Sequence, residues 1–208
     1  MTGMQHRIAS ALAGRYDLEG KIGQGGMATV YLAHDVKHDR RVALKVLQPE
    51  VASLLGSDRF LQEIRIAAQL QHPNILTLHE SGDAGGFLYY AMPFVDGESL
   101  RDLLQRTGPL DLETALSVNA EVADALSYAH RSGIIHRDIK PGNILLSEGH
   151  AVVADFGIAK AVSTAGGEPL TQTGFPLGTP GYMSPEQAAG TTRLDERTDV
   201  YSLACVFY

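Results

Sequence analysis

The chain has 208 residues, 44% of them hydrophobic and 20% charged, a balance that excludes an intrinsically disordered protein. Its formal net charge of −7 gives no overall basic surface for nucleic acid, so an anionic ligand needs a local cationic pocket. The single cysteine, Cys205, excludes an internal disulfide and a cysteine-based zinc site, and its apolar neighbours predict a buried thiol.

No signal peptide is recognisable, and no segment approaches the roughly 18 apolar residues of a membrane helix. We therefore expect a cytoplasmic location. Residues 1–15 have weak helical character and are interpreted as a leader.

A glycine-rich turn between two strands is the first motif. Residues 16–22 alternate as a half-buried strand does, and residues 30–33 predict a returning strand. Gly23, Gly25 and Gly26 lie between them, where a backbone without Cβ atoms can approach a ligand and turn N–H groups toward phosphates. A dinucleotide-binding fold would need a helix after the glycines. Taken alone, an ordinary hairpin turn is an equally good interpretation.

Residues 41–47 predict the next strand, in which Lys45 alternates out of an apolar run and needs a carboxylate partner. Residues 58–70 have helical periodicity, and Glu63 on that helix is our choice of partner. Glu50 is the competitor, but it follows Pro49 and is predicted to lie in a loop. The alternative is that Lys45 and Glu63 are two solvated charges.

Two further strands are predicted at residues 76–79 and 87–92, joined through the turn-rich segment 81–86. The segment before residue 93 therefore contains five strands and one long helix. The pattern then turns helical, with helices at 99–106 and 111–132, and Gly133 ends the second of these.

A polar loop follows, from His136 to Asn143, and it precedes apolar strands at 144–146 and 151–154. Asp138 could accept a hydroxyl proton, Lys140 could neutralise a phosphoryl group, and Asn143 could offer its carbonyl oxygen to Mg²⁺. Asp155, directly after the second strand, is another candidate metal ligand. The alternative is that these residues are turn and surface charges.

The segment 158–180 has no periodicity, and loops this long are usually functional or disordered. It contains Thr171 and Thr173, where a phosphate would add charge that an arginine such as Arg137 could bind. Residues 195–208 predict a helix that is apolar nearly all round and therefore buried.

The loop 136–143, the later Asp155-Phe156-Gly157 and the segment 178–186 together resemble the catalytic loop, magnesium motif and activation-segment end of protein kinases. Lys140, two places after Asp138, is typical of serine/threonine kinases, and the chain is similar to their bacterial, eukaryotic-like branch from residue 16 to its last residue. Three positions depart from the family pattern: Ile139 for leucine, Ala28 for the third glycine and Ser184 for alanine.

The resemblance implies an α+β fold with two lobes. Residues 16–92 would form an N-lobe with a five-stranded antiparallel sheet and one long helix, 93–97 a hinge, and 98–208 a mainly helical C-lobe. Because domains of this family continue for about sixty more residues, we also expect a truncated C-lobe with exposed apolar surface and weak activity.

The resemblance also assigns roles. Lys45, oriented by Glu63, would hold the α- and β-phosphates, and Thr179 would help to seat the acceptor hydroxyl. Asn143 and Asp155 would bind Mg²⁺ or Mn²⁺, and Asp199 would brace the catalytic loop. Met92 would be the gatekeeper, with adenine bonded to the backbone of Pro93 and Val95. The nucleotide-binding residues implied are Ile22, Gly23, Gln24, Gly25, Gly26, Met27, Val30, Ala43, Lys45, Met92, Pro93, Val95 and Leu145.

The implied activity is transfer of the γ-phosphoryl group of ATP to serine or threonine hydroxyls of proteins, regulated by autophosphorylation at Thr171 or Thr173 and read by Arg137. A homodimer formed through the N-lobe is a further expectation, and no nucleic-acid partner is expected. Two alternatives stay open: a non-catalytic nucleotide-binding or scaffold module, and a small-molecule phosphotransferase. The peptide-binding end of the activation segment, residues 178–186, argues against the second of these.

Overall fold

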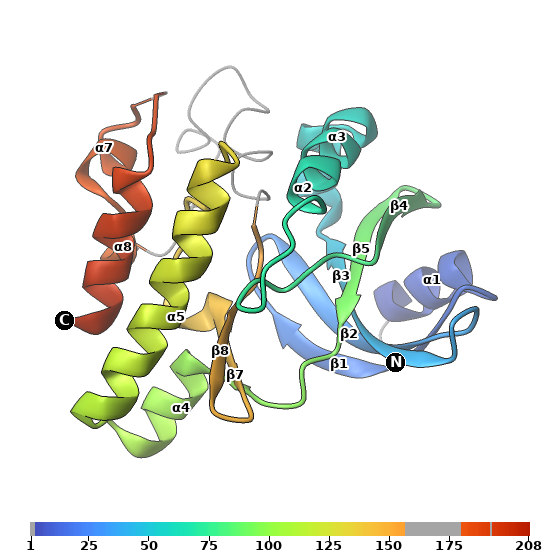
Figure 1. The fold of residues 1–208 in the computed structure, drawn as a ribbon. Coiled ribbons are helices and arrows are strands. Elements are labelled where there is room, and N and C mark those ends of the chain that lie inside the picture. The colour runs from blue at the N-terminus through green and yellow to red at the C-terminus, as the bar shows by residue number, and fades with distance from the viewer. Residues whose placement is uncertain (1–2, 157–179, 192) are drawn as a thin grey trace. The chain divides into compact units, whose positions relative to one another are not determined.

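The computed structural model describes residues 3–156, 180–191 and 193–208 (Figure 1). The chain divides into two compact units, which are described one at a time. The first comprises Met1–Arg65 and Leu78–Phe94, and the second comprises Ile66–Thr77 and Val95–Tyr208. Within the described ranges, no helix combines the length and apolar character that a membrane crossing requires.

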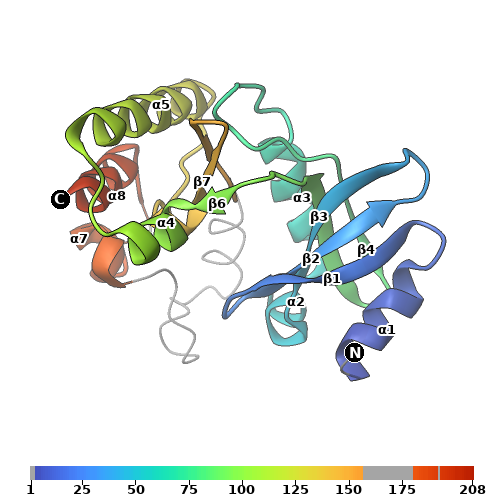
Figure 2. The same ribbon diagram turned by 90° about the horizontal axis from the view of Figure 1, so that it is seen from below.

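The first unit is built on a five-stranded sheet in which every neighbouring pair is antiparallel, so the predicted N-lobe sheet is confirmed (Figure 2). The turn between the first two strands is closed by a 2.9 Å hydrogen bond from the Gly25 N–H to the Ala28 carbonyl. The strands, in their order across the sheet, are β1 (Tyr16–Gln24), β2 (Ala28–Asp35), β3 (Arg40–Leu47), β5 (Phe87–Pro93) and β4 (Glu80–Ala84).

Helices cover both faces of this sheet. Helix α1 (Gly3–Leu12) buries Ile8 and Leu12 in a cluster with alternate residues of β3 and β5, among them Leu44 and Tyr89. The predicted leader is thus helical, and its apolar side belongs to the core. On the other face lie α2 (Pro49–Leu55) and α3 (Ser57–Ala67), where the Phe60 ring packs 6.5 Å from that of Tyr90.

The prediction of a strand at residues 76–79 is wrong. The edge strand is instead β4, made largely from the segment predicted to be a turn, and it pairs with β5 from Glu80↔Ala91 to Ala84↔Phe87. Gly85 and Gly86 alone make the turn, both with positive φ (60° and 84°). Two adjacent glycines supply the tight hairpin geometry, so the polar residues before them are free to pair.

The prediction that Glu50 lies in a loop is also wrong. Pro49 occupies the first turn of α2, where its missing N–H is not needed, and Glu50 is the acidic residue of that turn. Gly56, at φ 71°, ends α2, and α3 starts at the next residue. Helix α3 then ends at Ala67, three residues before the predicted end.

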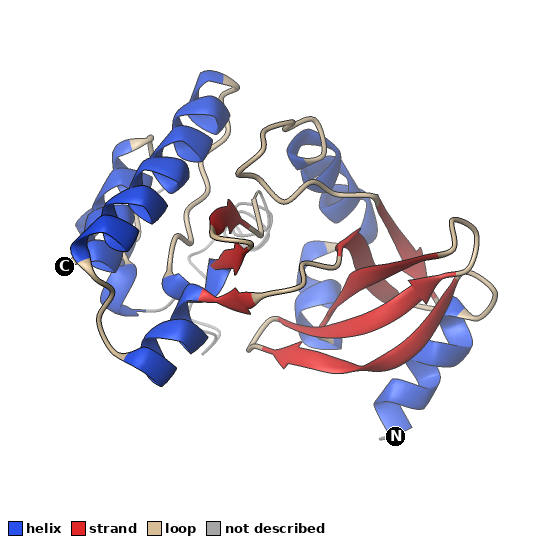
Figure 3. Ribbon diagram, turned by 60° about the horizontal axis from the view of Figure 1, so that its bottom comes forward, coloured by secondary structure: helices blue, strands red, loops and turns tan. Residues whose placement is uncertain are grey.

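The second unit contains a three-stranded antiparallel sheet and the longest described helix (Figure 3). The short helix predicted at 99–106 and the long one predicted at 111–132 are both confirmed. Ser99 and Asp111 cap their starts by accepting from the N–H groups of Asp102 and Thr114, and Gly133 (φ 73°) follows the second. The elements are β6 (Glu98–Ser99), α4 (Leu100–Thr107), α5 (Leu112–Arg131), β7 (Ile144–Ser147), β8 (His150–Val153), α7 (Pro185–Ala188) and α8 (Arg197–Phe207), with 3₁₀ turns at Pro141–Asn143 and Pro180–Tyr182.

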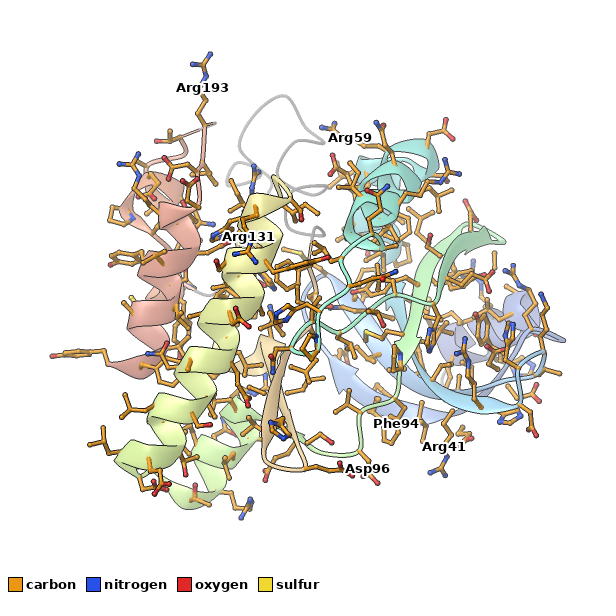
Figure 4. All side chains as sticks on the ribbon, viewed as in Figure 1. Arg41, Arg59, Phe94, Asp96, Arg131 and Arg193 are labelled. Atoms are coloured by element: carbon orange, nitrogen blue, oxygen red, sulfur yellow. The ribbon has the colours of Figure 1, made fainter. Side chains whose placement is uncertain are left out.

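The segment that leads into β6 requires a glycine. A Cβ on Gly97 would lie 2.0 Å from the Leu146 carbonyl oxygen, which is inside any tolerable contact. Beside it, the carbonyl of Asp96, labelled in Figure 4, accepts a 2.9 Å hydrogen bond from the Ser147 hydroxyl. The segment is therefore held against β7 by backbone contacts.

Two burial predictions for the last helix are wrong. Helix α8 buries a partly polar face with Thr198 and Ser202, whereas Val200 and Tyr201 are 59% and 43% exposed. Its polar side chains are buried because they hydrogen-bond: Ser202 Oγ donates to the Tyr182 carbonyl at 2.7 Å. Cys205 is half-buried rather than buried.

Replacement of Leu12 tests whether α1 belongs to the folded core. Leu12 is 0% exposed, so Leu12→Ala should lower the free energy of unfolding by about 3 kcal/mol, because methyl groups and their contacts are lost from a packed site. Urea denaturation measures this. Leu112→Ala is the matched control, since Leu112 is 75% exposed and should change the value by under about 0.5 kcal/mol. Equal effects of the two substitutions would contradict the packing of α1.

Candidate active site

One buried carboxylate holds the backbone of the polar loop in the second unit. Asp199, on α8, is 0% exposed and accepts from the N–H of His136 at 2.8 Å and the N–H of Arg137 at 2.7 Å. The Nε2 atom of His130, in the last turn of α5, lies 2.8 Å from the same carboxylate. A buried charge is tolerable when hydrogen bonds replace its water, and three partners do so here. The predicted brace is confirmed.

Two residues at the site have unusual backbone conformations. Arg137 has φ 69° and Asp155 has φ 70°, in the left-handed region that residues with a Cβ seldom adopt. Such a conformation costs on the order of 1–3 kcal/mol and persists only where surrounding contacts over-determine it. At Arg137, the hydrogen bond from its N–H to Asp199 is one such contact.

His136 links the polar loop to the strand that precedes Asp155. Its ring is 0% exposed, and Nε2 lies 2.8 Å from the Ala154 carbonyl. Nδ1 accepts from the Asp138 N–H at 3.2 Å, so the network assigns the proton of the neutral ring to Nε2. The ring also meets Phe156 edge to face, with centroids 4.6 Å apart.

The predicted catalytic trio is brought together in this loop. Lys140 Nζ lies 2.7 Å from Asp138 Oδ2, and Asn143 Nδ2 lies 3.1 Å from the same oxygen and 2.7 Å from the Asp138 backbone carbonyl. The side chains of Asp138 and Lys140 are about one-quarter exposed, at 25% and 26%. A partly exposed carboxylate held between a cation and an amide can accept a proton while the cation stabilises nearby negative charge.

The oxygen donors of Asn143 and Asp155 fit a hard divalent cation. Because Nδ2 of Asn143 makes both of its hydrogen bonds to Asp138, Oδ1 is the atom able to coordinate. Asn143 and Asp155 are tied together through the chain by a 2.9 Å bond from the Ala154 N–H to the Asn143 carbonyl. Amide and carboxylate oxygens are typical Mg²⁺ ligands, and this cation usually completes its shell with water and phosphate. In the described ranges, no cluster of three or more His, Cys, Asp or Glu side chains could hold a metal.

In the first unit, several predicted nucleotide-binding residues share one face of the sheet. Val30 and Tyr90 flank Lys45 on the neighbouring strands, and Ala43 lies opposite Met92. Directly paired residues point to the same side of a sheet, and residues two apart on one strand do as well. All five therefore face the same way.

That face is the one covered by α3. Tyr90 packs against Phe60 of α3, and Lys45 Nζ lies 5.9 Å from the centre of the Tyr90 ring. Glu63 is one helical turn beyond Phe60 on α3. Lys45 and Glu63 thus lie on the same side of the sheet, and their ion pair stays a prediction.

The other predicted site residues lie as follows. Ile22 is 50% exposed near the end of β1, and Gly23 lies opposite Val30. Leu145 is on β7, opposite Ser99. The remaining nucleotide-binding predictions occupy the glycine turn and the end of β5: Gln24, Gly25, Gly26, Met27, Pro93 and the following Val95. Thr171, Thr173 and Thr179 lie outside the described residues.

The end of the predicted activation segment contains contacts that were not predicted. Ser184 caps α7 and forms a capping box with Gln187, a pattern that the spacing Ser-x-x-Gln could have revealed. Glu186 accepts from Thr198 Oγ1 at 2.9 Å, and hydrogen bonds from its own N–H and from Thr198 lower the pKa of its carboxyl. No local pattern signals the contacts of His130 or Gln187 with residues far along the chain.

Comparison with known proteins identifies the arrangement. The sequence model described as "protein kinase domain" matches residues 16–208. Over 214 residues, the chain is 44% identical to serine/threonine-protein kinase PknB of Mycolicibacterium smegmatis, covering 100% of this chain and 33% of that protein. It is also 44% identical over 212 residues to serine/threonine-protein kinase PknA of Mycobacterium tuberculosis, covering 99% of this chain and 48% of that one. The chain thus spans a third to a half of these relatives.

Solved structures agree with this result. The crystal structure of the M. tuberculosis PknI kinase domain superposes with a TM-score of 0.73 at 32% sequence identity. The match covers 93% of this chain and 71% of that chain. Both the α+β fold and the order of its elements are therefore shared with kinase domains.

Removing the Asp199 charge tests the anchor. In Asp199→Asn, the amide NH₂ must face at least one of the donors that the carboxylate now satisfies, so the free energy of unfolding should fall by about 1–3 kcal/mol. Hydrogen exchange at the amides of His136 and Arg137 should accelerate in the same variant.

Asp39→Asn is the control, because Asp39 is 95% exposed and asparagine tolerates its positive φ of 47°. Denaturation and amide exchange are measured for both variants. Unchanged exchange at residues 136 and 137 in Asp199→Asn would show that another group holds the loop.

Proposed function

Because the chain belongs to the protein kinase family, we propose that it transfers the γ-phosphoryl group of ATP to serine and threonine hydroxyls of proteins. The names of its relatives PknB and PknA support this activity, and they cover the chain almost completely. The observation that carries the proposal is the Asp138 carboxylate, held by Lys140 and Asn143 in a loop whose backbone is anchored by Asp199.

In this mechanism, Asp138 orients the acceptor hydroxyl and receives its proton. Its carboxylate is partly exposed, so an incoming hydroxyl can reach it. Lys140, 2.7 Å from that carboxylate, balances its charge and stabilises negative charge on the phosphoryl group in transfer. Little covalent chemistry is asked of the protein, so the rate gain comes from positioning and electrostatics.

Asn143 and Asp155 are the residues that would hold magnesium or manganese. When bound, the cation neutralises phosphate oxygens and helps to orient them. The anchored loop fixes the Asn143 amide through its two hydrogen bonds to Asp138, so its carbonyl oxygen is presented without further ordering.

Lys45, paired with Glu63, would hold the α- and β-phosphates, and the glycine turn would cover them. The shared sheet face of Val30, Ala43 and Met92 would supply the apolar contacts of the adenine ring. Pro93 lacks an N–H but keeps its carbonyl as an acceptor for the adenine, and Val95 can both donate and accept. The proposed substrates are ATP and proteins with accessible Ser or Thr, in the cytoplasm.

Asp138→Asn tests this function. Incorporation of labelled phosphate from ATP and Mg²⁺ into a generic basic protein should fall about 10²- to 10⁴-fold, because an amide cannot accept the proton. Nucleotide affinity, measured separately by a fluorescent ATP analogue, should change little. Asp124→Asn removes an acidic side chain that is 68% exposed on α5 and should leave both values unchanged.

The outcomes are distinct. A wild-type protein that binds ATP but incorporates no phosphate would favour a nucleotide-binding scaffold. Transfer to small alcohols instead of protein would favour a small-molecule phosphotransferase. An active wild type with equally active Asp138→Asn would remove Asp138 from the mechanism.

Regulation by phosphorylation at Thr171 or Thr173, read by Arg137, is a further part of the proposal. Mass spectrometry of the active protein should find phosphate on at least one of the two threonines. Thr171→Ala and Thr173→Ala, made singly and together, should lower activity, because the added charge and its arginine contact are lost. The double variant Ser163→Ala/Thr164→Ala, in the same segment, is the control. An active protein with neither threonine modified would refute this regulation.

A further inference from the structure

Gln187 joins the end of the activation segment to the catalytic loop. It lies on α7, where its Oε1 accepts from the Ser184 N–H at 3.1 Å. Its Nε2 donates to the backbone carbonyl of Arg137 at 2.8 Å, across 50 residues of sequence. One side chain therefore contacts both segments.

The two contacts fix the orientation of the amide. With the amide reversed, its oxygen would face the Arg137 carbonyl and its NH₂ would face the Ser184 N–H, so both contacts would become repulsive. Only one orientation satisfies both partners. Gln187 is thus a specific connector rather than a side chain that happens to lie nearby.

The contact between Gln187 and the Arg137 carbonyl is made at the peptide group directly before Asp138. The N–H of Arg137 is held by Asp199 and its carbonyl by Gln187, so both ends of a residue at φ 69° are fixed. The carbonyl belongs to the peptide plane shared with Asp138. Fixing that plane fixes the direction in which the Asp138 side chain leaves the backbone.

We propose that Gln187 is a positioning residue for Asp138, coupling the end of the activation segment to the proposed proton acceptor. The inference rests on the proposed kinase function. The N–H of the same peptide group, that of Asp138, donates to His136 Nδ1 at 3.2 Å. Without the Nε2–H donor, this longer bond alone holds the peptide plane, which can then rotate away from the conformation that suits transfer.

The competing explanation is that Gln187 serves only to cap α7. Ser184 Oγ accepts from the Gln187 N–H at 3.4 Å, and the Gln187 side chain returns the bond. Glutamate completes a capping box as well as glutamine does, because only an acceptor oxygen is needed. Gln187→Glu therefore keeps the cap and removes the donor to Arg137.

Three variants separate the two roles. In Gln187→Glu, kcat should fall about tenfold, the factor expected for one lost hydrogen bond. Its melting temperature should stay above that of Gln187→Met, because the cap of α7 is retained. Gln187→Met loses both contacts, so both its kcat and its melting temperature should fall. Gln105→Glu makes the same chemical change on the exposed side of α4 and should alter neither value. The KM for ATP should be unchanged throughout.

Each result decides between the explanations. A wild-type kcat in Gln187→Glu, with a reduced melting temperature in Gln187→Met, would reduce Gln187 to a helix cap and overturn the inference. A fall in kcat that disappears when the rate is expressed per ATP-binding molecule would also overturn it, because the loss would then be one of folded protein. A wild-type protein without phosphoryl transfer would overturn the proposed function itself, a failure that the labelled-phosphate assay detects before any variant is made.

Discussion

The buried carboxylate of Asp199 is the interaction on which the second unit depends. It receives the N–H groups of His136 and Arg137 together with the ring of His130, and so a helix near the end of the chain fixes a loop some sixty residues earlier. Burying an unpaired carboxylate at 0% exposure would cost much desolvation free energy. The three hydrogen-bond donors offset this cost and fix the groups that donate. A neutral acceptor would bind the same N–H groups less strongly, since hydrogen bonds to charged groups are the stronger ones.

Further hydrogen bonds, most of them to backbone atoms, connect the anchored loop to the segments around it. His136 is held by its own N–H, and its ring then contacts the Ala154 carbonyl and the Asp138 N–H. Asn143 closes the other side of the loop through the Asp138 carbonyl. Because nearly every contact involves a main-chain atom, the positions of Asp138 and Asp155 depend on the whole network rather than on a single pair. Left-handed residues at 137 and 155 are tolerated for the same reason.

Much of this could be predicted from the sequence, because the information was local. Alternating apolar and polar residues, with glycines between them, predicted β1, β2 and their turn. Helical periodicity followed by Gly133 predicted α5. The failures were also local in origin. The polar segment before Gly85 looks like a turn until β5 offers a pairing partner, and Pro49 looks like a helix breaker until it occupies a first turn. Gln187 and His130 could not be found, because their contacts join segments with no shared sequence pattern.

The same reasoning explains why motif residues near the site differ in how freely they can vary. Ile139 replaces the leucine of the kinase pattern at a position that is 1% exposed, where only volume and apolarity matter. Ser184 replaces alanine and gains a role, since its hydroxyl caps α7 and lies 3.4 Å from Thr198 Oγ1. His136, by contrast, must donate from one ring nitrogen and accept at the other while buried. No other side chain offers a donor and an acceptor on opposite edges of so small a ring. We therefore expect that no substitution of His136 keeps both hydrogen bonds.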